Sequence, residues 1–367
     1  MKTITNILIL IILFPFCIKS QSNCFVNDSI QTYLQFLKRN EKSPEEYTAK
    51  KFRQHDIVIV GEVHQKKEYC ELISKIIESS DINYFATEFI KSSNSDKINQ
   101  IVTAKEFDRE KAVDIFRDYT WPIWGFEEYV NIIQSVWKVN SSKKPKDHVK
   151  IIGLDSEWSQ FENMCANRKP ADDILKQNME REDNMVKAVK EKYSKGTKIL
   201  VHIGFAHTLY KLKPRFAAEL YSEFGDKVFQ ICLHQQFEGN LAKMTISKDI
   251  EKIMEANNNV PVGFDVENSP FAKINDASCY YFKVPQQQSL KDIAMGYIFI
   301  KPFPQLGIVT WVPGFINEYN FEKAKCVSLK MGFIKSEPQT IKEFNESMSL
   351  YFNGKEAGEN HNKLPRR

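Results

Sequence analysis

The stretch Asp56-Ile57-Val58-Ile59-Val60-Gly61-Glu62-Val63-His64 decides the fold of this chain. Its β-branched run is too short for a helix and has no polar face, which is typical of a strand buried on both sides in a parallel sheet. Glu62 and His64 are two positions apart, so in an extended segment their side chains share one face. A carboxylate beside an imidazole orients it and raises its basicity, which suits general-base catalysis or metal ligation. The alternative is a helix-capping carboxylate followed by a solvent-exposed histidine.

Three further short apolar runs each lead into an acidic residue or a histidine, and helical patterns separate these runs. Because the carboxyl ends of parallel strands meet at one sheet edge, where ligands bind, their polar residues are expected to converge there. We therefore predict an α/β fold with a mostly parallel central sheet, helices on both faces and helical additions. Glu62, His64, Glu88 and His207 are expected to lie in one cleft at that edge. The further runs are residues 84–87 before Glu88, residues 150–152 before Asp155, and residues 198–203 before His207.

Each of these polar residues also has an ordinary structural interpretation. Glu88 alone reads as a charge that terminates a strand, since a carboxylate is costly inside one unless it is paired. Asp155 binds a ligand or caps the segment that follows, and the pattern slightly favours the cap. His202 lies inside an apolar run and is interpreted as a hydrogen-bonded core histidine.

Two further features lie between these runs. A helix predicted from residue 172 to about residue 193 places Arg181 and Glu182 on its apolar stripe, so the two form a buried ion pair or reach into a cavity. The segment at residues 120–126 is dense in aromatic residues, including Trp121 and Trp124. It is interpreted as core or as a wall on which a ligand stacks.

Composition and the amino terminus indicate an exported globular protein. Of the 367 residues, 42% are apolar and 27% are charged, and the net charge is only +4. No basic stripe is interleaved with aromatic residues, which argues against nucleic acid as a partner. Lys2 and the apolar residues 7–16 form a signal peptide, predicted as residues 1–20, and no later segment has the length of a transmembrane helix. We expect a secreted or periplasmic protein; lipid attachment at Cys17 ranks second, because residues 14–16 are not small.

The cysteine count and the element pattern give the remaining organisation. Six cysteines follow Cys17. Their spacing matches no zinc motif, and at most one disulfide is expected, with its connectivity open. Cys232 lies in an apolar run and is predicted to be a buried free thiol. The predicted divisions are a helical lead-in at 21–50, an α/β domain at 51–305, a C-terminal extension at 306–353 and a disordered tail at 354–367.

Taken in order, these residues resemble the erythromycin-esterase/ChaN-like superfamily, which includes the Tiki and TraB proteins. The resemblance covers roughly residues 55–235 and is greatest with the erythromycin-esterase branch. The stretches that carry it are Gly61-Glu62-Val63-His64, Glu88, Trp121-Pro122-Ile123-Trp124, Glu127-Glu128-Tyr129, Asn140, Ile152-Gly153-Leu154-Asp155, Arg181-Glu182, Met185 and Gly204-Phe205-Ala206-His207.

The resemblance implies an α/β sheet whose Glu and His pairs face one cleft, but it implies several chemistries. Macrolide esterases of this superfamily open a lactone with a His-activated water, Tiki proteins are metal-dependent proteases, and ChaN proteins bind haem. This chain departs from the esterase motif, which has one more residue between Glu and His and a Gly after the His. Here Gln65 follows His64, and Lys66 and Lys67 stand where an arginine is expected. The resemblance therefore does not indicate the substrate of this chain.

We expect an exported hydrolase acting on a small molecule or peptide, with an ester or lactone favoured. Glu62, His64, Glu88 and His207 form its catalytic set, and Asp155, Arg181, Glu182, Trp121 and Trp124 support them or contact substrate. The alternatives are a binding protein of ChaN type, in which the same four residues hold a divalent metal or haem, and a metal-dependent protease of Tiki type. A metal-free mechanism is favoured over a metal-dependent one, because no local pair has a recognised metal-binding spacing. The oligomeric state is not indicated.

Overall fold

The computed structural model describes residues 22–40, 42–118, 124–156, 165, 174–236, 248–279, 288–331, 334 and 336–353. The expected signal peptide, Trp121 and the expected disordered tail lie outside these residues. Among the described residues, no helix combines the length and the apolar character needed to cross a membrane.

A seven-stranded sheet forms the centre of the molecule, in the order β3-β2-β4-β1-β5-β7-β6. All neighbouring strands run parallel except β6, which pairs antiparallel with β7 at one edge. The predicted α/β class with a mostly parallel sheet is confirmed. The strands are β1 (Ile57–Glu62), β2 (Tyr84–Lys91), β3 (Lys150–Asp155), β4 (Ile199–Gly204), β5 (Val228–Leu233), β6 (Val262–Asp265) and β7 (Gly296–Phe299).

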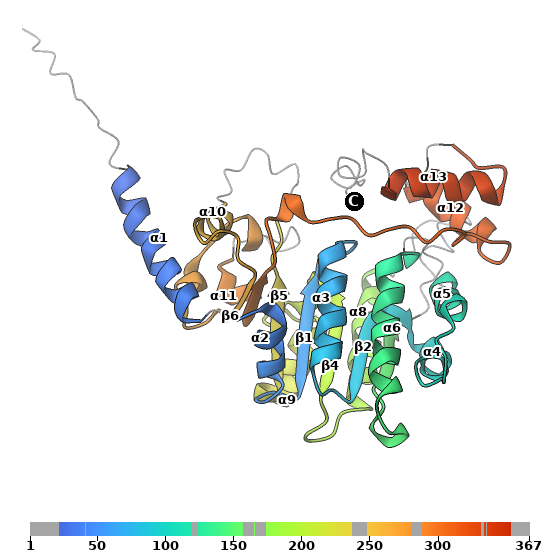
Figure 1. The fold of residues 1–367 in the computed structure, drawn as a ribbon, viewed down its shortest axis with the longest axis horizontal. Coiled ribbons are helices and arrows are strands. Elements are labelled where there is room, and N and C mark those ends of the chain that lie inside the picture. Colours follow the sequence, from blue (N-terminus) through green and yellow to red (C-terminus); the bar gives the residue numbers. More distant parts are fainter. Residues whose placement is uncertain are drawn as a thin grey trace, which may run out of the picture.

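Helices cover both faces of the sheet, with α3 and α6 in front of it and α8 and α9 behind it in Figure 1. Most helices follow a strand and return the chain to the opposite edge of the sheet. Such a crossover is the connection that neighbouring parallel strands require. The helices are α1 (Ser22–Arg39), α2 (Pro44–Lys51), α3 (Lys67–Ser79), α4 (Ser95–Val102), α5 (Arg109–Arg117), α6 (Glu127–Ser141), α8 (Ile174–Lys190), α9 (Phe216–Phe224), α10 (Asp249–Ala256), α11 (Leu290–Ile293), α12 (Phe321–Met331) and α13 (Ile341–Asn353).

Alternating side chains of β1 feed two separate apolar cores. Val58 and Val60 pack on the side of α3 and α6, whereas Ile57 and Ile59 pack on the side of α8 and α9. This alternation explains why the strand is apolar at every position. A third core lies beside β6 and β7, where side chains of α10 and α11 pack against these two strands. The β6 edge of the sheet is therefore also covered by helices.

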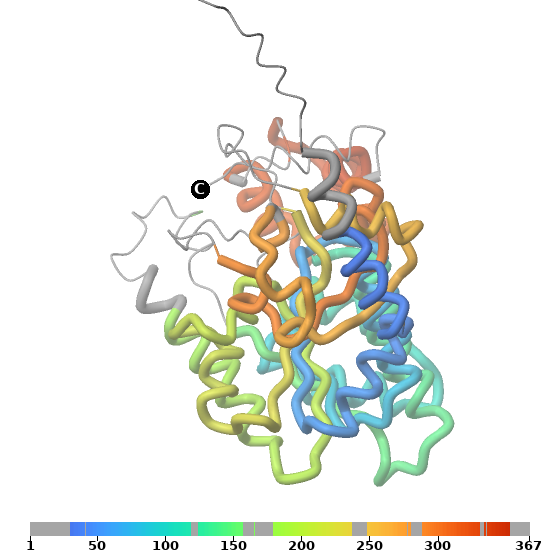
Figure 2. The backbone as a smooth tube through the Cα atoms, turned by 90° about the vertical axis from the view of Figure 1, so that its left-hand side faces the viewer, coloured from blue at the N-terminus to red at the C-terminus, as the bar shows by residue number. Residues whose placement is uncertain are grey.

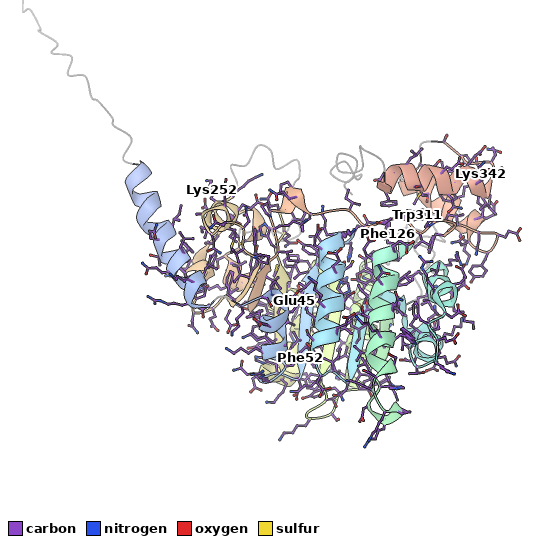
Figure 3. All side chains as sticks on the ribbon, viewed as in Figure 1. Glu45, Phe52, Phe126, Lys252, Trp311 and Lys342 are labelled. Atoms are coloured by element: carbon purple, nitrogen blue, oxygen red, sulfur yellow. A yellow bond between two sulfur atoms is a disulfide. The ribbon has the colours of Figure 1, made fainter. Side chains whose placement is uncertain are left out.

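After β7 the chain crosses the carboxyl edge of the sheet as an extended strap, residues 306–315, before it forms α12 and α13 (orange to red in Figures 1 and 2). The strap makes isolated bridges from Ile308 to Lys66 and from Trp311 to Phe126. The Phe126 and Trp311 rings lie 5.9 Å apart, centroid to centroid (Figure 3). The strap thus links the turn after β1 to the start of α6.

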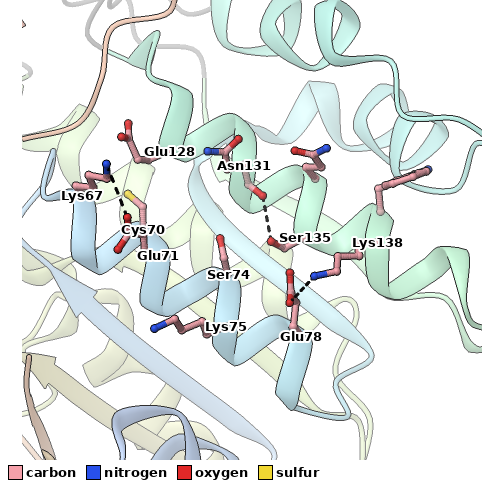
Figure 4. Close-up of a pocket in the computed structure, with 12 residues that line it drawn as sticks. Lys67, Cys70, Glu71, Ser74, Lys75, Glu78, Glu128, Asn131, Ser135 and Lys138 are labelled. Carbon is pink, nitrogen blue, oxygen red and sulfur yellow. Dashed lines mark hydrogen bonds and ion pairs between the residues drawn. The ribbon is translucent and has the colours of Figure 1, made fainter. Parts of the chain in front are cut away.

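One disulfide, Cys165–Cys326, is present among the described residues and ties α12 to the segment that follows β3. Cys70, Cys232 and Cys279 are buried free thiols, as predicted for Cys232. A groove of 520 Å³ lies between α3 and α6 (Figure 4). It has mixed charge, with Lys138 2.8 Å from Glu78, and none of the predicted site residues lines it.

Candidate functional site

Glu62 and His64 form the part of the cluster that reaches solvent. Glu62 is the last residue of β1, where its register partner is Gly204 of β4. His64 lies just beyond the strand, and its Nδ1 is 3.2 Å from Oε1 of Glu62. About 36% of the His64 side chain is exposed, whereas Glu62 is fully buried. No described residue forms a hydrogen bond with Nε2 of His64, so this nitrogen is available to bind a ligand or accept a proton.

The turn that carries His64 has a constrained backbone. Gln65 adopts φ = 69°, in the left-handed region that non-glycine residues rarely occupy. This conformation costs roughly 1–2 kcal/mol for an L-residue, so the surroundings must hold it. The Gln65 N–H donates to the hydroxyl of Tyr129 at 3.3 Å, and its carbonyl accepts from the N–H of Val309 in the strap at 3.2 Å.

Glu62 has two further buried partners. Tyr129 of α6 donates its hydroxyl to Oε1 at 2.9 Å, and Nε2 of His202 lies 2.6 Å from Oε2. His202 Nδ1 is buried without a hydrogen-bond partner, so its proton resides on Nε2 and is donated to Glu62. Burial would raise the pKa of Glu62, but the imidazoles of His202 and His64 outweigh it and lower the pKa to about 2. Glu62 is therefore a carboxylate at any physiological pH.

Glu88 belongs to an ion cluster built around Arg181. It lies inside β2, three residues before the strand ends, and not just past a strand as predicted; the β2–β3 register shifts between Thr87 and Lys91, which lets the strand continue beyond it. The Arg181 guanidinium donates to Glu88 at 2.7 Å and to Asp155, the last residue of β3, at 2.6 Å. Burial raises the pKa of Glu88, but His207 and Arg181 hold it well below its usual range.

His207 follows β4 in a single 3₁₀ turn, Phe205–Thr208. Its Nδ1 lies 2.8 Å from Glu182 of α8, and its Nε2 lies 3.4 Å from Glu88 and 3.0 Å from the Arg181 guanidinium. Burial lowers the pKa of His207, but the two carboxylates outweigh it and raise the pKa to about 9. The imidazolium donates from Nδ1 to Glu182, and its Nε2 faces the Glu88 carboxylate at the longer distance of 3.4 Å. Above that pKa, Nε2 instead accepts a hydrogen bond from Arg181.

Gly204 joins the two halves of the cluster. Its N–H donates to Oε2 of Glu88 at 2.6 Å. A Cβ atom at Gly204 would lie 2.6 Å from the His64 ring and 3.1 Å from Glu88, so only glycine allows this close approach. Hydrogen bonding to Glu62 and the charge of Glu88 together overcome burial and raise the pKa of His64.

A metal ion does not fit this donor set. Among the described residues, no three His, Cys, Asp or Glu side chains are arranged to hold one. Each carboxylate already receives protein donors, and the Arg181 guanidinium stands between Glu88, Asp155 and His207 as the local cation. A divalent ion would have to displace these bonds and lie beside that positive charge. We therefore assign no step to a metal.

The structure brings together Glu62, His64, Glu88 and His207, with Asp155, Arg181 and Glu182 around them. Both members of the Arg181–Glu182 pair are buried and point into the cluster. Trp124 packs edge-on against His64 at 5.1 Å. The catalytic roles of these residues stay predictions.

Sequence reasoning missed Tyr129 and the part that His202 has in the cluster. Tyr129 is part of a stretch that carries the resemblance, and nothing in that stretch shows that its hydroxyl reaches Glu62. His202 was interpreted as a core histidine, and it is buried, but its partner is Glu62. The signal available for His202 is its register, since it pairs with Val60 of β1, two positions before Glu62.

No protein-family model matches the sequence, and neither does any curated protein. The fold is matched by the crystal structure of a succinoglycan biosynthesis protein, with a TM-score of 0.52 and 12% identity over 75% of this chain and 96% of that one. An erythromycin esterase, EreC, is matched with a TM-score of 0.47 and 10% identity, over 71% of this chain and 96% of that one. The haem-binding ChaN of Campylobacter jejuni is matched with a TM-score of 0.36 and 13% identity, over 52% of this chain and 86% of that one.

The likeness to the succinoglycan biosynthesis protein supports the α/β fold of this chain. At these identities the likeness concerns the fold alone, and activity has to be argued from the site.

Proposed function

We propose that this protein is an exported hydrolase in which His64 removes a proton from water. The observation that carries the proposal is the Glu62–His64 pair, because Nδ1 is held by a carboxylate while Nε2 is open and the ring is partly exposed. A carboxylate that receives Nδ1–H fixes the tautomer and increases the basicity of the other nitrogen. The water would be bound at Nε2, give a proton to His64 and attack the substrate carbonyl. As the ester C–O bond then breaks, the protonated His64 would return this proton to the leaving alkoxide.

His207 has a different part in this proposal. The sequence left His64 and His207 as equal candidates for the base. With a pKa raised to about 9 by Glu88 and Glu182, His207 carries a positive charge at neutral pH and has no free lone pair. It supports the reaction as a fixed cation beside developing negative charge on the carbonyl oxygen. Ester and lactone substrates are favoured because hydrolysis of either develops this oxyanion.

Export is supported by two independent features. The amino-terminal segment has the charge and apolar length of a signal peptide. The Cys165–Cys326 disulfide is typical of proteins that fold in an oxidising compartment.

The decisive experiment is hydrolysis of a panel of p-nitrophenyl esters and aryl lactones by the purified protein and by His64→Gln. We expect a loss of about a hundredfold or more in kcat for the variant, the size of one general-base contribution. His148→Gln is the matched control, because His148 lies before β3 at the opposite sheet edge and its imidazole bonds the carbonyl of Lys143. Equal rates for wild type and His64→Gln would refute the proposal. A Soret absorption band in the purified protein would favour the haem-binding alternative.

A further inference from the structure

We propose that Tyr129 is a positioning residue for His64, whose hydroxyl holds the Glu62 carboxylate and the Gln65 backbone in one arrangement. This inference rests on the proposed function of His64 as the base. Tyr129 contacts neither water nor substrate in the proposal, and acts through the residues on either side of His64.

The relative placement of Glu62 and His64 depends on a short piece of backbone. Glu62 belongs to a fully buried central strand, so its position is set by the sheet. His64 lies beyond the strand, and the direction of its ring depends on the turn at Gln65. If Gln65 relaxed to a negative φ, the peptide on either side would rotate and His64 would leave Glu62. Something must therefore hold this turn to the strand.

The Tyr129 hydroxyl is placed to do this. It donates one hydrogen bond to Glu62, at 2.9 Å, and accepts one from the Gln65 N–H, at 3.3 Å. The strap completes the arrangement from the other side, since Val309 N–H bonds the Gln65 carbonyl and Ile308 bridges Lys66. The carboxylate oxygen that accepts from Tyr129 is the one that faces Nδ1 of His64.

The aromatic ring of Tyr129 has a separate, structural part. It packs against Phe89, with ring centroids 4.6 Å apart, and against Phe126 at 6.0 Å. Phenylalanine keeps those contacts, so Tyr129→Phe removes the hydroxyl alone. Tyr297→Phe is the matched control, because Tyr297 is also fully buried and its hydroxyl bonds a histidine, His234, outside the cluster.

The first readout is the NMR titration of the His64 imidazole in the full-length protein, assigned from its absence in His64→Gln. In Tyr129→Phe we expect the His64 pKa to fall toward its ordinary value by about half a unit or more, a threefold change in proton affinity, because the ring moves away from Glu62. The second readout is ester hydrolysis, in which kcat falls by roughly ten- to a hundredfold at unchanged KM, since misplacement of a catalytic group acts on the chemical step. Tyr297→Phe leaves both readouts at their wild-type values.

A double-mutant cycle separates positioning from loss of stability. Glycine adopts a positive φ without strain, so in a Gln65→Gly background the turn no longer depends on the Tyr129 tether. Tyr129→Phe is then expected to change the His64 titration less than it does in the wild type. Additive effects would overturn the proposal, as would a wild-type titration in Tyr129→Phe. If the wild-type protein hydrolyses nothing, the proposed function fails, while the titrations still decide whether Tyr129 positions His64.

Discussion

The guanidinium of Arg181 lies 2.7 Å from the carboxylate of Glu88, a residue 93 positions earlier in the chain. The same guanidinium donates to Asp155, so one side chain of α8 joins the neighbouring strands β2 and β3. It supplies the positive charge that two buried carboxylates require.

Loss of Arg181 should therefore be costly. In Arg181→Met, Glu88 and Asp155 remain buried without their cation, and we expect the free energy of unfolding to fall by about 3–5 kcal/mol. Urea denaturation measures this loss. Arg215→Met is the comparison, because Arg215 is partly exposed and bonds Glu182, which keeps its bond from the N–H of Phe216. A loss in Arg181→Met no larger than in Arg215→Met would show that the cluster does not depend on this charge.

The rate of hydrolysis should depend on pH through two histidines. His64 acts as a base only when neutral, and because Glu62 and Glu88 raise its pKa, the rising limb of kcat should lie above pH 6.5. His207 stabilises charge only when protonated, so the rate should fall near pH 9. The profile of kcat against pH tests this. An alkaline limb that persists in His207→Gln would contradict the part given to that residue.

Stability should also decline at alkaline pH. His207 has a folded pKa of about 9 against an ordinary value of 6.5, so the native state binds its proton more tightly than the unfolded chain does. The resulting stabilisation is complete below pH 6.5 and is lost as pH rises through 9. The difference of 2.5 units corresponds to about 3 kcal/mol. Chemical denaturation across this range should show the decline in wild type and in His148→Gln, and not in His207→Gln.

Metal removal gives an independent test of the mechanism. Because Arg181 provides the local cation and the carboxylates are already bonded, we expect dialysis against EDTA to leave ester hydrolysis unchanged. Elemental analysis of the protein before and after dialysis checks that any bound ion was removed. Activity that is lost and then returns with a divalent ion would make His64 and His207 ligands and would remove the basis for a histidine base.

The sequence was sufficient for the strands β1 to β4 and for most of the cluster. Apolar runs that end in polar residues identify parallel strands, and the shared carboxyl edge then places Glu62, Asp155 and His207 near one another. Glu88 was placed near the correct edge, but the extension of β2 past it depends on a register shift that no local pattern reveals. The antiparallel strand β6 was missed because it has only four residues and follows a stretch with weak periodicity.

Contacts that come from distant parts of the chain could not be predicted. Glu182 has the spacing of a helix stripe and Arg181 lies beside it, but this pattern does not say which strands the two side chains meet. The positive φ of Gln65 is invisible in the sequence, since glutamine has no preference for it and the cause lies in Tyr129 and Val309. The connection Cys165–Cys326 spans 161 residues and equally could not be chosen from spacing.

The strap has a consequence for the order in which the molecule can be completed. All seven strands are available once the chain has been synthesised to Phe299. The turn after β1 receives its contacts from the strap only later, since Gly307 bonds Glu68 across 239 positions of sequence. A polypeptide that ends at residue 305 would therefore contain every strand of the sheet while the carbonyl of Gln65, beside His64, lacked its bond from Val309. The proteolytic susceptibility of the turn, rather than that of the sheet, would report whether synthesis had passed the strap.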